Sequence, residues 1–436
     1  MEKLQIQKFG ITKDGSKPYL YKMKNDAGME VQVSDFGATL VNVTVLDQDK
    51  NPVEVVLGYE DAAGYENGTA AIGAIVGRNA NRIGGACVTI NGIDYKLAEN
   101  DGKNNLHSGP DVYQKRMWRV VENGDDHVTF LLHSPDGDQG YPGALDMKVT
   151  YTLDEENGLT IHYEAVPDQD TVINMTNHSY FNLNGHKSGS VLHHRMQLLS
   201  DAFTPADAQS IPTGEVCSVD GTPMDFRSTK ELGAEIDAAY EPLILGNGYD
   251  HNWVLNTEFG KVQKFAQVED EKAGRTMEVY TDLPGVQFYA GNFIDPEMKA
   301  VSSWKYGQTV REFRFIQPIS WKMKQEGMGQ SIRSGMQCAW RHRIIRMRSI
   351  RKIFLKQSAK KGKLTIQRPL IVSILNRKRK DWHIYGKINL HSGKTKCCKR
   401  VCKSFEIKCK EPGRIHGVGE CDCYVVCRTS CDNELS

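Results

Sequence analysis

Short runs in which apolar and polar residues alternate recur from about residue 28 to residue 293. The runs at residues 31–33, 128–132 and 277–280 show this alternation, and Gly, Asn and Asp residues separate one run from the next. A period of two directs successive side chains to opposite faces of a β-strand. The pattern therefore predicts many short strands and few long helices.

Residues 148–164 carry the clearest hairpin signal. Two alternating runs, at residues 148–153 and 159–164, are separated by the sequence DEENG. The Asn-Gly pair in this sequence can supply the positive φ angles that a tight turn needs. Many strands of this kind, without helices between them, predict an all-β fold, namely a large antiparallel β-sandwich.

Charge and cysteine content divide the chain into two parts. Residues 1–299 hold 24 basic and 45 acidic residues, whereas residues 300–436 hold 31 basic and 9 acidic residues. Of the 11 cysteines, only Cys87 and Cys217 lie in the first part, and eight are crowded into residues 397–431. The asymmetry predicts a sandwich domain at residues 1–299 and a separate basic, Cys-rich tail at residues 300–436.

The composition also restricts the cellular setting. No apolar run approaches the roughly 18 residues of a membrane helix, and residues 1–10 lack the apolar core of a signal peptide. An odd number of cysteines, without a secretory signal, argues against a disulfide framework. We therefore expect a cytoplasmic protein that does not contact membranes.

Five turn-rich segments combine His, Arg, amide, carboxylate or aromatic groups. They are GRNANRI at 77–83, NNLHSG at 104–109, NMTNHSYFNL at 174–183, GYDHN at 248–252 and LPGVQFYAGN at 283–292. Vicinal hydroxyls bind acceptors such as Asp and Gln, donors such as Arg and Asn, and a flat apolar wall. Together these groups predict a site for a neutral polyhydroxylated ligand.

In order and spacing, the five segments resemble the motifs of the aldose 1-epimerase (galactose mutarotase) family, over about residues 5–298. The resemblance implies a large antiparallel β-supersandwich. It also implies a cofactor-free, metal-free isomerase that interconverts the α and β anomers of free hexoses such as D-galactose and D-glucose. Its partner would be the hexose alone, and the chain would be a monomer or a homodimer.

The resemblance also implies residue roles. His178 would protonate the ring oxygen of the sugar, and His107 would help to hold and polarise the same region. The expected substrate-binding residues are Asn81, Arg82, His107, His178, Ser179, Tyr180, Asp250 and Gln287. Opening a hemiacetal requires a proton at the ring oxygen while another group removes the C1 hydroxyl proton, and a histidine titrates in a suitable range for the first step. Ser108 stands where the family usually has Gly.

The match to the family breaks where its general base is expected. The family carries a Glu in a strand of the form Cys-Leu-Glu-Thr-Gln, which this sequence lacks, and Glu312 is the only acidic residue at positions 299–325. Glu312 is therefore the candidate base. The alternative is a catalytically impaired carbohydrate-binding β-sandwich. Because the break coincides with the change in charge, we hypothesise that the tail lacks the family's C-terminal strands and is an out-of-frame or disordered continuation.

The tail contains four further patterns. Residues 341–363 could form a basic amphipathic helix, and residues 412–420 resemble the sugar-binding motif of galactokinase-type kinases, without the Gly-Ser-rich phosphate loop that kinase activity needs. The clustered cysteines lack paired C-x-x-C spacing, so adventitious clustering is favoured over a zinc site. The basic run at 376–380 could contact nucleic acid, but a solvated charge run is favoured.

Overall fold

The computed structural model describes residues 4–293 and, beyond them, the backbone of five short strands. The chain divides into two compact units, Met1–Arg341 and His342–Ser436. In the second unit the described residues form an antiparallel sheet in the order β27-β29-β28, whose strands are β27 (Asp381–Tyr385), β28 (Ser404–Cys409) and β29 (Cys423–Arg428). All other elements described below belong to the first unit.

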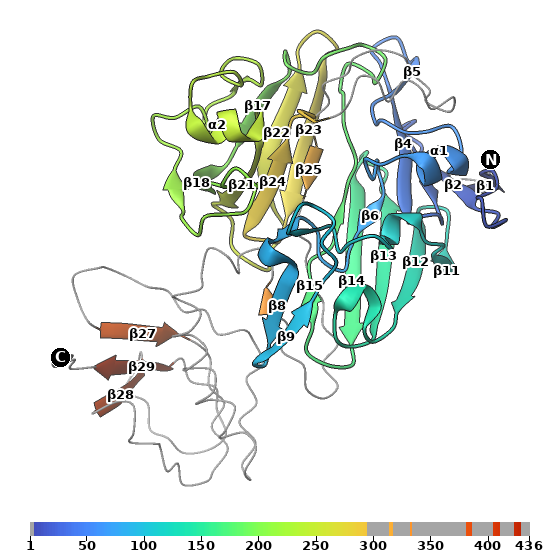
Figure 1. Cartoon of the computed structure of the whole chain (residues 1–436). Helices are drawn as coiled ribbons and strands as arrows, with labels where there is room; N and C mark the ends of the chain where they lie inside the picture. Colours follow the sequence, from blue (N-terminus) through green and yellow to red (C-terminus); the bar gives the residue numbers. More distant parts are fainter. Residues whose placement is uncertain are drawn as a thin grey trace. The chain divides into compact units, whose positions relative to one another are not determined.

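Two antiparallel sheets, which we call the first lobe, open the first unit (Figure 1). One sheet runs in the order β1 (Leu4–Lys8), β2 (Tyr19–Lys24), β3 (Glu30–Ser34), β4 (Thr39–Leu46), β5 (Pro52–Glu54). The other runs in the order β11 (Arg119–Asn123), β12 (His127–Ser134), β13 (Leu145–Leu153), β14 (Leu159–Pro167).

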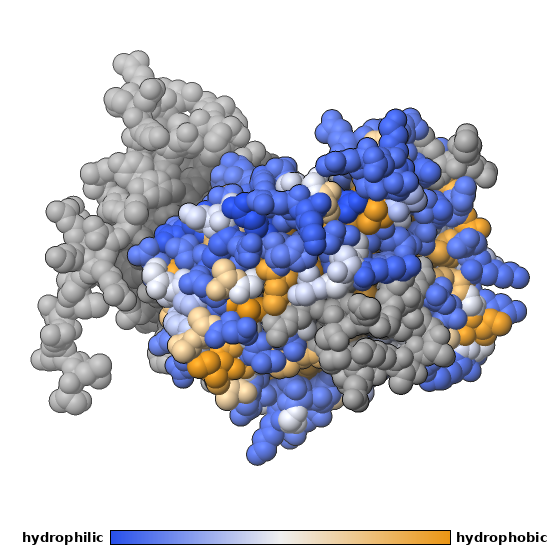
Figure 2. Space-filling view, turned by 90° about the horizontal axis from the view of Figure 1, so that it is seen from above, coloured by the Kyte–Doolittle hydropathy of each residue, from blue (hydrophilic) through white to orange (hydrophobic). Residues whose placement is uncertain are grey.

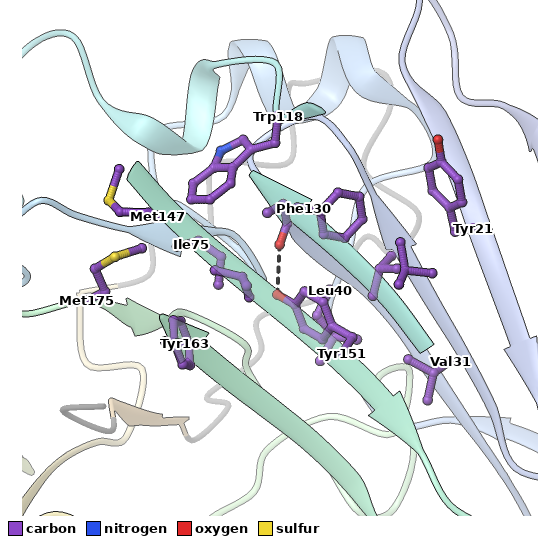
Figure 3. Packing of buried hydrophobic residues seen from close by; sticks show 14 of the residues in the cluster. Tyr21, Val31, Leu40, Ile75, Trp118, Phe130, Met147, Tyr151, Tyr163 and Met175 are labelled. Atoms are coloured by element: carbon purple, nitrogen blue, oxygen red, sulfur yellow. Dashed lines mark hydrogen bonds between the residues drawn. The ribbon is translucent and has the colours of Figure 1, made fainter. Parts of the chain in front are cut away.

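The core of the first lobe lies between these sheets. Along β13 every second side chain is buried, as the sequence alternation predicts. Trp118, Phe130 and Tyr151 pack there, and the buried Tyr151 hydroxyl donates a 2.7 Å hydrogen bond to the Ala38 carbonyl, dashed in Figure 3. The bond satisfies the one polar group that this ring brings into an apolar interior.

The predicted hairpin is confirmed, with β13 and β14 paired from Leu145↔Pro167 to Leu153↔Leu159. Only part of its expected turn chemistry holds: Asn157 takes φ +66°, whereas Gly158 does not take a positive φ. Gly158 serves another purpose. Its N–H donates to Asp154 Oδ1 at 2.7 Å, and a Cβ at position 158 would lie 2.3 Å from Asp154 Oδ2. The glycine is needed for this close approach.

A second pair of sheets, which we call the second lobe, lies beside the first (Figure 1). One sheet has the order β20 (Lys230–Glu231), β17 (Arg195–Leu198), β22 (Gln263–Asp270), β23 (Arg275–Thr281). The other has the order β19 (Cys217–Ser218), β18 (Ser200–Thr204), β21 (Asp250–Leu255), β24 (Gly285–Tyr289), β25 (Arg314–Ile316). Trp253, Phe265 and Phe288 are buried in the core of this lobe.

Short pairs of strands complete the first unit. They are β6 (Ile75–Val76) with β16 (Thr176–Asn177), β7 (Arg82–Ile83) with β10 (Asn105–Leu106), β8 (Cys87–Ile90) with β9 (Ile93–Lys96), and β15 (Val172–Ile173) with β26 (Ile332–Arg333). The helices of the described part are short: α1 (Ala62–Asn67), α2 (Glu241–Gly246) and the 3-10 turns Gly84–Ala86, Tyr113–Lys115 and Asp138–Gly140.

The architecture confirms the predicted all-β fold. The alternating runs at residues 31–33, 128–132 and 277–280 lie in β3, β12 and β23. Figure 2 shows a face of the molecule that is mostly hydrophilic, with hydrophobic residues in small groups. Within the described residues, no helix combines the length and apolar character needed to cross a bilayer.

Several predictions fall outside the described residues. These are the candidate base Glu312, the helix at 341–363, the basic run at 376–380 and the kinase-like motif at 412–420. The side chains of the clustered cysteines lie outside them too. The predicted domain boundary near Lys299 also stays a prediction, although the first unit extends to Arg341 and includes β25 and β26.

Candidate active site

The two histidines singled out by sequence are brought together by one stretch of chain, residues 75–83, which we call the central segment. On one side its strand β6 pairs with β16, directly before His178; on the other its strand β7 pairs with β10, directly before His107. The two imidazole rings meet edge to face, with centroids 5.5 Å apart and planes at 84°. Residues far apart in sequence thus form one polar centre.

His107 is fastened to Asn81 by two hydrogen bonds. The His107 N–H donates to the Asn81 carbonyl at 3.1 Å, and the Asn81 N–H donates to His107 Nδ1 at 3.0 Å. An Nδ1 atom that accepts a hydrogen bond carries no proton, so the neutral ring holds its proton on Nε2. The half-buried His107 side chain is therefore set up to donate a hydrogen bond from Nε2.

His178 is buried, with 4% of its surface exposed, and its backbone is fixed on both sides. Its N–H donates to the Ala74 carbonyl at 3.0 Å, and its carbonyl accepts from the Gly73 N–H at 2.9 Å. Gly73 has φ +66°, and a Cβ there would lie 2.1 Å from the Leu40 carbonyl oxygen. Only glycine permits this approach, so the location of His178 depends on it.

Asn81 directly precedes β7, which begins at Arg82, and both lie beside His107. Asn81 adopts φ +66°, and its Oδ1 accepts the Arg82 N–H at 2.9 Å. Arg82 Nε donates to Asp101 Oδ2 at 2.7 Å, and both side chains are partly exposed. The loop containing Asn81 is therefore held by short-range hydrogen bonds and one ion pair, while its polar groups remain near the solvent.

Asp250 and Gln287 come from neighbouring strands of the second lobe. β21 pairs with β24 through Asp250↔Tyr289 and Asn252↔Gln287, and Gln287 Nε2 donates to Asp250 Oδ1 at 2.9 Å. The adjacent His251 is buried, and burial lowers its pKa although Asp250 acts in the opposite direction. A neutral His251 leaves the Asp250 carboxylate available as a hydroxyl acceptor.

Aromatic contacts connect the histidines with this strand pair. The Tyr180 ring lies 5.4 Å from that of His178 and 6.2 Å from that of Tyr289, which stands opposite Asp250. Ser179 is buried as well, and its Oγ has no hydrogen-bond partner among the described residues. The predicted residues around the central segment and those of the second lobe are thus joined by a continuous set of contacts.

Two contributors were not assigned a role from sequence. Strand alternation could have indicated Tyr289, which lies two residues after Gln287 on a strand and so shares its face. Ser108 was noted only as a departure from the family, yet its Oγ accepts the Asn79 N–H at 2.7 Å and donates to the Asn79 carbonyl at 3.0 Å. No sequence pattern signals such a contact.

A second polar cluster lies in the second lobe, where His193, His194 and Asp270 place one donor atom each within 4.8 Å of one another. His193 Nε2 is 2.9 Å from Asp270 Oδ2. His194 Nε2, however, accepts the Leu183 N–H at 3.0 Å, so its lone pair is not available to a metal ion. The residue stabilises the fold instead. This donor set therefore does not fit a metal ion.

Comparison with known proteins identifies relatives of this chain. The sequence model of the family described as aldose 1-epimerase matches residues 19–327. The chain is 42% identical to a galactose mutarotase of Bos taurus over 289 residues, which are 66% of this chain and 81% of the relative. It is 38% identical to an aldose 1-epimerase of Escherichia coli over 284 residues, or 65% and 82% of the two chains.

Solved structures agree with these relatives. A galactose 1-epimerase from Lactobacillus acidophilus superposes with a TM-score of 0.63 at 28% identity, covering 73% of this chain and 92% of that one. An aldose epimerase homologue from C. elegans gives a TM-score of 0.61 at 29% identity, covering 68% and 88%. The family match extends past residue 298, where the motif resemblance ends, and includes the position of Glu312.

Proposed function

The chain belongs to the aldose 1-epimerase family, and we propose that it interconverts the α and β anomers of free hexoses such as D-galactose and D-glucose by opening and reclosing the sugar ring. The observation that supports this proposal best is the edge-to-face pair of His107 and His178, 5.5 Å apart and connected through Tyr180 and Tyr289 to the Asp250–Gln287 pair. In this proposal the acid groups and the hydroxyl-binding groups belong to one site.

The proposed chemistry needs one acid and one base. Protonated His178 donates a proton to the ring oxygen while a base removes the C1 hydroxyl proton, so the bond between C1 and the ring oxygen breaks and an aldehyde forms. His107, with its proton on Nε2, donates a hydrogen bond to the same region. Rotation about the C1–C2 bond and reversal of the proton transfers then give the opposite anomer.

The hydroxyl groups of the sugar would be held by the second lobe and by the central segment. Asp250 and Gln287 present a carboxylate and an amide on adjacent strands, Asn81 presents an amide just before β7, and Arg82 presents a guanidinium at the first residue of β7. Holding the sugar in one orientation converts its ring opening into a reaction between fixed neighbours. Glu312 is our candidate for the base. We expect the chain to act on its sugar as a monomer or homodimer in the cytoplasm.

Polarimetry of freshly dissolved α-D-galactose tests this proposal. The full chain should bring the rotation to equilibrium faster than buffer does, and His178→Ala should lower kcat by about 10² to 10⁴ because one positioned acid is lost. His162→Ala, on the partly exposed face of β14, is the matched control and should retain the wild-type rate. Wild-type activity in His178→Ala would exclude His178 as the acid.

A second candidate function follows from the missing Cys-Leu-Glu-Thr-Gln string. Without a base, the chain would bind hexoses and catalyse poorly. Calorimetric titration with galactose separates the two functions: saturable binding without faster anomer exchange indicates a carbohydrate-binding protein. If exchange is fast, Glu312→Gln should reduce it by about 10² or more, and an unchanged rate would remove Glu312 as the base.

A further inference from the structure

Three consecutive residues around His107 have left-handed backbone angles. His107 has φ +54°, Ser108 has φ +70° and Gly109 has φ +100°. Glycine adopts such angles freely, whereas a serine is strained there. Ser108 is also fully buried. Contacts that a glycine could not make must therefore stabilise this buried and strained serine.

Those contacts are made by its hydroxyl. Ser108 Oγ accepts the Asn79 N–H at 2.7 Å and donates to the Asn79 carbonyl at 3.0 Å, while the buried Tyr141 hydroxyl lies 3.4 Å away. A backbone residue in an antiparallel strand would satisfy the same two groups of Asn79. The Ser108 hydroxyl therefore takes the place of a paired strand residue opposite Asn79.

The replacement continues a ladder that otherwise ends. Leu106 pairs with Arg82 in the last regular position of β10, and His107 then binds the Asn81 backbone through its own N–H and its ring. The next residue, Ser108, hydrogen-bonds both the backbone N–H and the backbone carbonyl of Asn79 through its hydroxyl. Side chains thus extend the attachment of this loop to the central segment beyond the last paired strand residue.

The opposite edge of the central segment is also attached. The Asn174 N–H donates to the Arg78 carbonyl at 2.9 Å, and the Ala80 N–H donates to the Asn174 carbonyl at 2.6 Å. Asn174 lies shortly before β16 and His178. The central segment is therefore the common support of both histidines, and Ser108 fastens the His107 side to it.

We infer that Ser108 is a positioning residue for the ring-opening reaction, which holds the His107 ring with Nδ1 against the Asn81 N–H and so keeps the ring proton on Nε2. Its catalytic consequence rests on the proposed function. Without the hydroxyl, the His107 loop loses its attachment to Asn79, and the ring can rotate or exchange its proton between the two nitrogens. A small displacement of a catalytic group can lower a rate by about 10².

Ser108→Gly in the full chain is the decisive variant, because it removes the hydroxyl and relieves the backbone strain together. We expect kcat to fall about tenfold with little change in KM, while the melting temperature stays close to that of the wild type. Nitrogen-15 NMR of the imidazoles should change from one Nε2–H form for His107 to averaged signals. Ser108→Ala, which keeps the strain, should be less stable than Ser108→Gly.

The matched control is Ser200→Ala in the second lobe, whose buried hydroxyl lies within hydrogen-bond distance of the Val254 and Ala202 carbonyls. It should leave both kcat and the His107 signals unchanged. The inference is overturned if Ser108→Gly keeps wild-type kcat, or if kcat falls while the His107 signals remain those of one tautomer. If the wild-type chain does not catalyse at all, the proposed function fails, and the NMR signals still decide whether Ser108 holds the ring.

Discussion

Around the central segment, Asn81, His107 and Ser108 reach the site on backbone with φ between +54° and +70°, whereas Asp250 and Gln287 of the second lobe lie in paired strands. The side chains of the first group can point in directions that a regular strand does not allow, but each orientation depends on a few local contacts. The second group is fixed by a regular ladder. His107 and Asn81 thus lie on strained backbone, whereas Asp250 and Gln287, which we propose to bind sugar hydroxyls, lie on regular strands; backbone strain is common at functional sites.

The largest effect is expected from Gly73→Ala. The new Cβ would have to displace the Leu40 carbonyl, and φ +66° disfavours alanine, so the cost should be roughly 2–5 kcal/mol of unfolding free energy. Because the Gly73 N–H binds the His178 carbonyl, activity should also be lost. Urea unfolding and polarimetry measure the two effects.

Gly285→Ala in β24 is the matched change in the second lobe. Its nearest neighbour is the Asn252 side chain, 2.9 Å from the new Cβ, and its φ is not positive. A side chain can move aside, so this variant should lose less stability than Gly73→Ala. Equal losses in the two variants would contradict the contrast between a strained and a regular part of the site.

The second prediction separates binding from chemistry. Asp250→Asn removes a charged acceptor from the second lobe and should raise KM for galactose about 10- to 100-fold, with a smaller change in kcat. His107→Gln, beside the central segment, should act mainly on kcat. Initial rates over a range of galactose concentrations distinguish these outcomes, and a variant of Asp250 that changes kcat alone would reverse the assignment.

The elements that could be predicted from the sequence lie where the backbone is regular. The alternation of β12, β13 and β23 predicted strands, because burial of one face imposes a period of two on any sequence. The resemblance placed Asp250 and Gln287 in one site, and the pairing of β21 with β24 explains why they meet. In the hairpin turn, by contrast, Gly158 is required because the Asp154 carboxylate lies where a Cβ would be. The turn rules do not include this contact.

The strained part could not be predicted in the same way. Ser108 depends on a hydrogen bond to Asn79, which is distant in sequence, and the position of Gly73 is dictated by the Leu40 carbonyl. These are steric and hydrogen-bond constraints between segments that only the folded chain brings together. Periodicity and composition describe one segment at a time, so they contain no signal for such contacts.

The third prediction uses pH to compare the interiors of the two lobes. In the first lobe, burial raises the pKa of Asp35 to about 6, although its bond from the Tyr19 N–H acts against this. The folded state then binds a proton that the unfolded state has released, so the stability contributed by Asp35 is present below about pH 4 and lost as pH rises through 6. In the second lobe, burial lowers the pKa of His194 to about 4 against the pull of Asp270, so its contribution is lost as pH falls from about 6.5 to 4.

Asp35→Asn should therefore stabilise the chain near neutral pH by about 2 kcal/mol, and the gain should shrink towards about pH 4. His194→Gln should be less stable than the wild type near neutral pH, and the difference should shrink as pH falls. Urea unfolding at a series of pH values measures both trends. If the stability changes of the two variants varied with pH in the same direction, burial would not shift the pKa values of Asp35 and His194 in opposite directions.

The smallest effect is expected at the ion pair of Arg82 with Asp101, which supports the strained loop from outside. Both side chains are partly exposed, at 21% and 34%, and such pairs contribute less than about 1 kcal/mol. Asp101→Asn should lower kcat/KM about two- to fivefold without a measurable change in stability, and high salt should produce part of the same loss in the wild type. Glu30→Gln, which removes the partner of Lys22 in the first lobe, should leave kcat/KM unchanged. A loss above about tenfold in Asp101→Asn would mean that charge, rather than the hydrogen bonds around His107 and Ser108, holds the loop.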